Sequence, residues 1–375
     1  MLQLTNGVKN AYAIQAINAF VIGMISIVVP LLMVDRGVSV ESIGIIFSVL
    51  PLVAQTNRLI FGTISDYVGR KKFYVMNGFM NIIFLGTYYF ASTPLWFLFG
   101  KIFEGVRNAT LWSVNRAYFL DHSKNKEKIL IELRGMNSVF ESLGTLLAGF
   151  LLILLSYDNT ILFLMLLSLF LFPNIRMLKD KTRSTLNLKH AFKSLDVRYR
   201  NKRFKNFIWI FLLIGLSWGF IAGYILPLFL DGMGVPVGMI GLLLGVRILM
   251  NGLSVYVFSS IWSGKTKLLV GGTLFSILLI LLPSVEYSVM PIILVMMGTV
   301  AGISDAGYET IFTSITDRNS LGKDMGILMI GVQLGMAVTQ ALSGFVITNL
   351  GFSAMFTMSA ILYFMFSISS YKNLK

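Results

Sequence analysis

Charged side chains within long apolar stretches are the first candidates for chemistry in this sequence. A charge at the centre of a membrane-spanning helix costs about 2.5–3.5 kcal/mol on insertion scales, so each one calls for a function or a partner. The charged residues in these stretches are Arg58, Lys101, Glu104, Arg107, Arg116, Glu141, Arg247, Asp305 and Glu309. Arg58 and Arg116 lie near the ends of their stretches, so we expect roles in topology or gating, with side chains that extend to the polar boundary.

The acidic residues favour proton coupling. Asp305 and Glu309 are one helical turn apart and therefore share a face. Desolvation favours the neutral form of a buried carboxyl group, which can then bind and release a proton near neutral pH. We expect Asp305, Glu309 or Glu104 to act in this way, or to bind substrate. The alternative for Glu104 is an ion pair with Arg107, three residues further on.

The basic residues support a second hypothesis. Arg107 and Arg247 suit an anionic substrate, because guanidinium groups bind carboxylate or phosphate with two parallel hydrogen bonds. If acids neutralise both arginines, the remaining carboxylates favour a cation instead. Aromatic residues such as Trp112 and Trp218 could stack on a substrate, although packing is their more common role.

The elements that hold these residues are membrane-spanning helices. Hydrophobic residues make up 56% of the chain and charged residues 13%, far from the balance of soluble domains. Apolar stretches of about twenty residues recur along the whole sequence, and each is long enough to cross a bilayer. We predict twelve spans, at 11–33, 43–62, 73–92, 95–120, 135–156, 160–177, 206–229, 239–262, 268–284, 289–314, 324–348 and 352–371. The first stretch lacks a cleavage site and is expected to be a retained span.

The basic residues predict the topology. Nearly all Lys and Arg outside the spans fall on one side, and Arg36 alone falls on the other. Short loops rich in Lys and Arg stay cytoplasmic, so both termini are predicted to be cytoplasmic in a multi-pass cell-membrane protein. The net charge of +14 is thereby explained without a nucleic-acid partner.

Two halves of the chain match each other. Pro30, Gly37 and Gly44 correspond to Pro227, Gly234 and Gly241, and Gly105 corresponds to Gly302 at the same offset of 197. Gly135 and Gly144 match Gly326 and Gly335 at an offset of 191. We therefore predict an N-terminal six-helix bundle at 1–177, a basic linker at 178–205 that lies on the membrane surface or in solvent, and a C-terminal bundle at 206–375. Two such parallel halves with a site between them are a known transporter architecture.

The loop after the second span carries a recognisable motif. It reads Gly62-Thr63-Ile64-Ser65-Asp66-Tyr67-Val68-Gly69-Arg70-Lys71-Lys72 and resembles the signature loop of the major facilitator superfamily. The resemblance implies a cytoplasmic latch between the halves in the outward-open state, formed by Gly62, Asp66, Gly69, Arg70 and Lys71. It also suggests Asp121 as the partner of Arg70. Lys101 to Gly105 is an altered form of a span-four motif of proton-coupled drug exporters, and the Gly-Pro pair of their fifth span is absent.

The resemblance further implies that spans one, four, seven and ten line a central cavity. Glu104, Arg107 and Asn108 in span four and Asp305 and Glu309 in span ten are then expected to meet there, and the repeat aligns Asn108 with Asp305. Glu141 in span five and Arg247 and Asn251 in span eight could complete the lining.

We expect a secondary active transporter of a small molecule that works by alternating access, as a proton-coupled exporter (an antiporter). The alternatives are an importer or exchanger of an organic anion, a carrier of lipids, and a receptor or sensor on a transporter scaffold. No cofactor is expected, and an enzyme is not favoured: the chain has no cysteine, its two histidines are His122 and His190, and no phosphate-binding Gly-rich loop is present. The expected partners are a small-molecule substrate, protons and the lipid bilayer, and we expect the monomer to be functional.

Overall fold

The computed structural model describes residues 6–122, 126–178, 201–315 and 321–374. Within these ranges the chain is helical, and no strand occurs. The predicted all-helical membrane fold with two six-helix bundles is confirmed.

The N-terminal bundle contains six spans, two of which are interrupted. The fourth span passes from α4 through a π-helix at Leu111–Asn115 into α5, and the sixth consists of α7 and α8. The helices are α1 (Asn6–Asp35), α2 (Val40–Val68), α3 (Lys71–Tyr89), α4 (Pro94–Thr110), α5 (Arg116–His122), α6 (Lys126–Leu154), α7 (Tyr157–Leu169) and α8 (Leu171–Arg176).

The C-terminal bundle repeats this plan with different interruptions. The seventh span breaks between α10 and α11, and the last two spans form one helix that bends sharply at Gly351, whose φ is 78°. The helices are α10 (Lys202–Gly219), α11 (Ile225–Gly232), α12 (Val237–Phe258), α13 (Gly264–Leu281), α14 (Met290–Ile315) and α15 (Leu321–Asn373), with a 3₁₀ turn at Leu282–Ser284.

The last residues of the predicted linker are helical. α10 begins at Lys202, and the Asn201 side chain caps it by accepting a hydrogen bond from the Phe204 backbone N–H at 2.7 Å. The rest of the predicted linker, 179–200, lies outside the described residues. His190 lies there as well.

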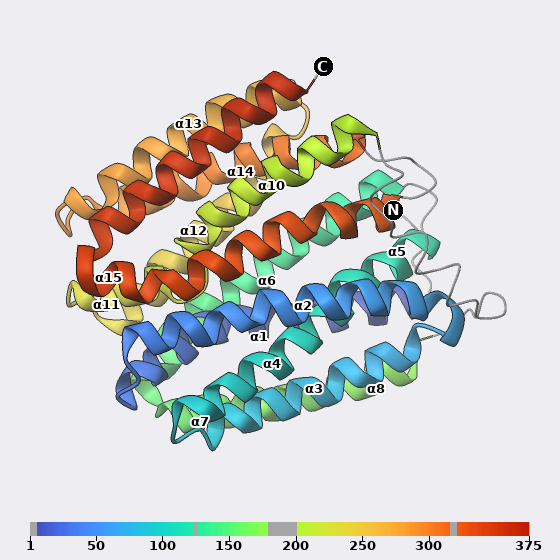
Figure 1. The fold of residues 1–375 in the computed structure, drawn as a ribbon. Helices are drawn as coiled ribbons and strands as arrows, with labels where there is room; N and C mark the ends of the chain where they lie inside the picture. The colour runs from blue at the N-terminus through green and yellow to red at the C-terminus, as the bar shows by residue number, and fades with distance from the viewer. Residues whose placement is uncertain (1–5, 123–125, 179–200, 316–320, 375) are drawn as a thin grey trace.

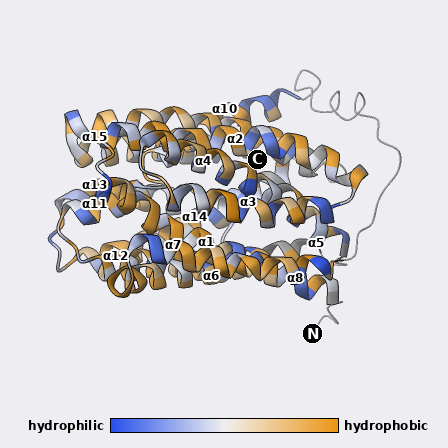
Figure 2. Cartoon of the chain, turned by 90° about the horizontal axis from the view of Figure 1, so that it is seen from below, coloured by the Kyte–Doolittle hydropathy of each residue, from blue (hydrophilic) through white to orange (hydrophobic). Residues whose placement is uncertain are grey.

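Eight helical segments in the described residues are long and apolar enough to cross a membrane, and the last of them, within α15, holds two predicted spans. Hydrophobic residues cover most of the length of these helices in Figure 2. Large apolar side chains such as Leu154, Trp209 and Tyr256 are exposed. Exposed apolar surface of this extent is typical of a protein whose outer face contacts lipid.

The two halves meet along two helix pairs, α2 with α15 and α6 with α12 (Figure 1). Glycines let these helices approach closely. A Cβ atom on Gly149 of α6 would lie 2.7 Å from the Val237 carbonyl oxygen of α12, and a Cβ on Gly344 of α15 would overlap the Val40 carbonyl of α2. Both chain ends lie at one end of the bundle, opposite the bend of α15, as an even number of crossings requires (Figure 1).

Candidate functional site

The structure brings four predicted site residues to one cavity of about 400 Å³. Glu141 comes from α6, Arg247 and Asn251 come from α12, and Asp305 comes from α14. Trp218, Ile221, Phe275 and Met297 are among the residues that supply apolar wall, and Ser138 and Tyr363 add hydroxyl groups. The wall thus combines apolar and aromatic side chains with converging polar and charged groups, which can fix the orientation of a bound small molecule.

Hydrogen bonds orient the acids of this cavity. The Asn251 amide donates to Asp305 Oδ2 at 3.0 Å, and the Asn137 amide donates to Glu141 Oε2 at 2.9 Å. Arg247 interacts electrostatically with both Glu141 and Asp305. Its Nε has no hydrogen-bond partner among the described residues. The cavity therefore offers both signs of charge to a solute.

The acids of α14 are ion-paired across the two halves. Arg134 of α6 lies 3.0 Å from Asp305 Oδ2 and also donates to Glu309 Oε1. Arg116 of α5 approaches Glu309 at 4.0 Å. Asp305 and Glu309 on one half thus face arginines that belong to the other half.

Arg134 is the residue that the sequence reasoning missed as part of the site. It was placed with the basic residues outside the spans, because it precedes the apolar part of the fifth span. Ser138 and Glu141 follow Arg134 at i+4 and i+7, so the three residues share one face of α6. This spacing could have indicated from the sequence that Arg134 belongs to the site.

The polar residues of span four lie elsewhere. The alternative partner considered for Glu104, Arg107, is not the one that the structure places beside it: Glu104 Oε2 pairs with Lys101 Nζ at 2.8 Å and accepts a hydrogen bond from the Tyr88 hydroxyl at 2.7 Å. Lys101 also lies over the Phe47 ring at 3.9 Å. Lys101 and Arg107 each lie three residues from Glu104, so spacing alone allowed either as its partner. The hydrogen bond from Tyr88 of α3 holds the Glu104 carboxylate on the side of Lys101.

Arg107 is fully buried in the N-terminal bundle and bonds to amide oxygens. It donates to the Asn18 carbonyl at 2.8 Å, to Asn81 Oδ1 at 3.2 Å and to Asn108 Oδ1 at 2.9 Å. Asn77 donates to Thr110 and accepts from Asn18, which extends the network. The expected meeting of Glu104, Arg107 and Asn108 with Asp305 in one cavity is therefore not seen: the residues that line the described cavity come from spans five, seven, eight, nine, ten and twelve.

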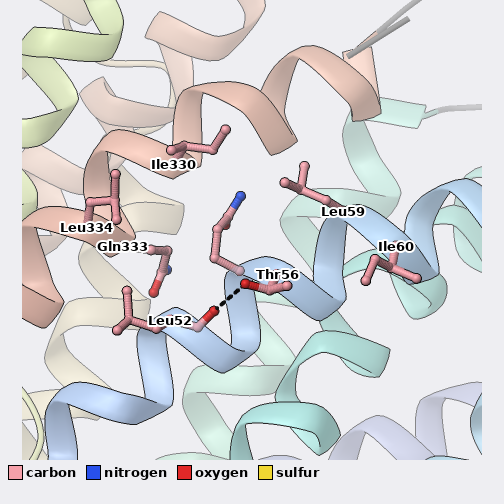
Figure 3. Close-up of a pocket in the computed structure, with 8 residues that line it drawn as sticks. Leu52, Thr56, Leu59, Ile60, Ile330, Gln333 and Leu334 are labelled. Carbon is pink, nitrogen blue, oxygen red and sulfur yellow. Dashed lines mark hydrogen bonds between the residues drawn. The ribbon is translucent and has the colours of Figure 1, made fainter. Parts of the chain in front are cut away.

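A second, mostly apolar pocket of about 380 Å³ lies between α2 and α15 (Figure 3). Leu52, Leu59, Ile60, Ile330 and Leu334 supply its walls. Gln55 and Gln333 are its amide residues, and Gln55 donates across the halves to the Gly326 carbonyl at 2.9 Å.

Comparison with known proteins identifies the family. The model of the Major Facilitator Superfamily matches residues 11–283, well over half of the chain. The protein belongs to the Major Facilitator Superfamily. No curated protein sequence gives a significant match. Membership makes the chain a transporter rather than an enzyme.

Solved structures of superfamily transporters share the fold over nearly the whole chain. A mutant of the nucleoside transporter NupG has a TM-score of 0.80 at 13% identity and covers 98% of this chain and 99% of its own. The unmutated NupG structure has a TM-score of 0.76 at 15% identity, with coverages of 96% and 98%. The human organic anion transporter MFSD10 has a TM-score of 0.69 at 14% identity, with coverages of 97% and 98%. At these identities the similarity shows the fold alone.

The signature loop of the superfamily is partly described. The Arg70 guanidinium lies 2.7 Å from Asp121 Oδ2, as the sequence suggested, and Lys71 Nζ donates to the Arg176 carbonyl at 2.7 Å. Gly69 ends α2 with a φ of 92°, which glycine adopts without strain. Both contacts join parts of the N-terminal bundle, the Asp66 side chain lies outside the described residues, and the latch between the halves stays a prediction.

Proposed function

We propose that this protein is a proton-coupled secondary active transporter that moves a small solute by alternating access. The ion pairs of Arg134 with Asp305 and Glu309 carry the proposal, because they join α6 of one half to α14 of the other. Protonation of the two carboxyl groups removes their negative charge and the attraction that holds the halves together at that end. The same carboxylate, Asp305, lines the cavity and can therefore respond to a bound solute.

The direction of the pH effect follows from the surroundings of the acids. Arg134, Arg116, Arg247 and Asn251 face Asp305 or Glu309 with positive charge or amide donors, and Tyr308 and Tyr363 lie nearby. In the proposed mechanism, proton binding to either carboxyl group removes its charge and with it the ion pair to Arg134. Low pH therefore favours opening at the end of the bundle where the termini lie.

The proposal includes the topology predicted from the sequence. Residues 1–177 and 206–375 are the two moving units in a cell membrane, both termini are cytoplasmic, and the monomer is the transporting species. Protons enter the cell both when the solute is exported against them and when an anion is imported together with them. The solute moves in opposite directions in the two cases, so they can be distinguished by experiment.

The absence of cysteine from the chain gives a direct test. Ala301 lines the cavity, and an Ala301→Cys substitution places a single thiol there. In inside-out membrane vesicles we expect labelling of this thiol by an impermeant maleimide to increase as pH falls. The double variant Asp305→Asn/Glu309→Gln and the variant Arg134→Gln should label rapidly at every pH.

Glu286→Gln is the matched control, because Glu286 is exposed in the turn before α14 and should leave the pH dependence unchanged. Labelling that does not depend on pH in the otherwise unaltered Ala301→Cys protein would overturn proton control of the opening.

A further inference from the structure

Arg58 is a buried cation that is paired with no carboxylate among the described residues. It lies on α2, it is 8% exposed, and its Nε and Nη1 atoms have no hydrogen-bond partner in the part of the chain that the structure describes. Its guanidinium carbon lies 4.6 Å from the centroid of the Trp112 ring. Burial of a charge is costly unless it is paired and hydrogen-bonded, so a partner is missing here.

A second arginine lies beside the same ring. The guanidinium carbon of Arg116 is 4.2 Å from the Trp112 centroid, and Arg58 and Arg116 repel each other electrostatically. Among the described residues, Arg116 approaches the Glu309 carboxylate at 4.0 Å, which is too long for a hydrogen bond. Both guanidinium groups therefore retain donors for a further acceptor.

The helix is irregular at this point. Trp112 belongs to the π-helix at Leu111–Asn115, and π-helical turns inside α-helices frequently mark functional sites. The wider turn places Trp112, which is 40% exposed, between the arginines of α2 and α5. Charge, aromatic surface and backbone irregularity thus coincide in one place.

We propose that Arg58 and Arg116, beside Trp112, bind the carboxylate or phosphate group of a soluble organic anion, which is the transported solute. The inference rests on the proposed function and names its substrate class. Guanidinium groups bind such oxyanions with two parallel hydrogen bonds, and one anion would also relieve the repulsion between the arginines.

Three probes with similar bodies and different charges test the assignment: phenylacetate, phenylethanol and phenethylammonium. We expect phenylacetate alone to raise the melting temperature of the purified full chain and to change its tryptophan fluorescence. Arg58→Gln should weaken phenylacetate binding by about 30-fold or more, as for loss of one partner of a buried charge pair. The melting temperature of Arg58→Gln without ligand should not fall, because an unpaired buried charge is removed.

Arg203→Gln is the matched control. Arg203 is a partly buried arginine at the start of α10 whose Nε also lacks a partner among the described residues, and its substitution should leave phenylacetate affinity unchanged. Trp112→Phe should abolish most of the fluorescence response while phenylacetate still stabilises the protein.

Other outcomes would overturn the inference. They are stabilisation by phenethylammonium in place of phenylacetate, loss of binding in Arg247→Gln but not in Arg58→Gln, and stabilisation by phosphatidylglycerol alone, which would assign the arginines to a lipid headgroup. Each of these leaves the pH-dependent labelling of Ala301→Cys intact. Anion binding without pH-dependent labelling would instead overturn the proton-coupled opening and retain the anion site.

Discussion

Several charged side chains in this protein are held by groups on other helices. Arg36, which is partly buried, pairs with Asp158 and donates to the Tyr88 carbonyl at 3.2 Å, which ties the end of α1 to α7 and to the last turn of α3. Arg107 is held by amide oxygens of α1, α3 and α4. Such residues stabilise one arrangement of the bundle, because each would be left uncompensated in any other.

The pair of Glu104 and Lys101 gives a prediction at this scale. Both side chains are less than 10% exposed, and Glu104→Gln would leave the Lys101 ammonium buried without its carboxylate. We expect a loss of about 3–5 kcal/mol in the free energy of unfolding. Thermal unfolding of the purified protein measures this loss.

Glu286→Gln, an exposed acid, should be close to neutral in the same assay. The double variant Lys101→Met/Glu104→Gln should recover most of the stability, because it leaves no buried charge. Equal melting temperatures for Glu104→Gln and Glu286→Gln would show that the buried pair does not stabilise the fold.

Several elements are shaped by irregular turns. The fourth span widens at the π-helix, the seventh span opens between Gly219 and Ile225, and α15 bends at Gly351. Each irregularity frees backbone groups or redirects side chains near a polar region or a seam between helices. The bend of α15 lets two spans follow each other without a loop.

Gly351 gives a prediction at the element scale. Its φ is 78°, and a Cβ atom there would meet nothing within 4 Å, so an added methyl group acts on the backbone alone. Its ψ is 171°, and backbone with positive φ and ψ near 180° is essentially restricted to glycine, so Gly351→Ala should lower the free energy of unfolding by about 1–3 kcal/mol.

Gly232→Ala is the control for this substitution, since Gly232 lies in the last turn of α11 with equal space around it and without positive φ. It should be neutral or slightly stabilising, because alanine favours helix over glycine. A comparable loss in both variants would mean that the bend does not require glycine.

At the scale of the whole molecule, the two ends of the interface between the halves differ in chemistry. At the end where α15 bends, glycine contacts bring α6 against α12 and α2 against α15. Toward the end where the termini lie, Arg134 pairs with Asp305 and Glu309. The glycine contacts contain no titratable group, so in the proposed mechanism protonation of Asp305 and Glu309 would open one end and leave the other closed.

Gly149→Val tests this division. The added side chain would meet the Val237 and Gly238 carbonyl groups and separate α6 from α12. We expect the Ala301→Cys thiol to become accessible from the outer side of right-side-out vesicles at every pH. Gly135→Val, on the same helix with open space around it, should not change this labelling.

The sequence by itself determined the class of the protein and most of its elements. Apolar stretches of span length, the repeat between halves and the loop from Gly62 to Lys72 were sufficient, because each depends on local composition and spacing. The same reasoning located Glu141, Arg247, Asn251 and Asp305, since a charge or amide within an apolar stretch is visible without coordinates.

Only the tertiary structure decided which of these groups meet. Spacing along one helix allowed Glu104 to pair with Arg107, but Tyr88 and Lys101 surround it instead. In the sequence, Arg134 has the features of a basic residue at a membrane boundary. The packing of α6 near α14 brings it within ion-pair distance of Asp305 and Glu309. Partners on different helices depend on how the helices rotate and pack against each other, and that rotation is set by many close contacts distributed over the whole bundle.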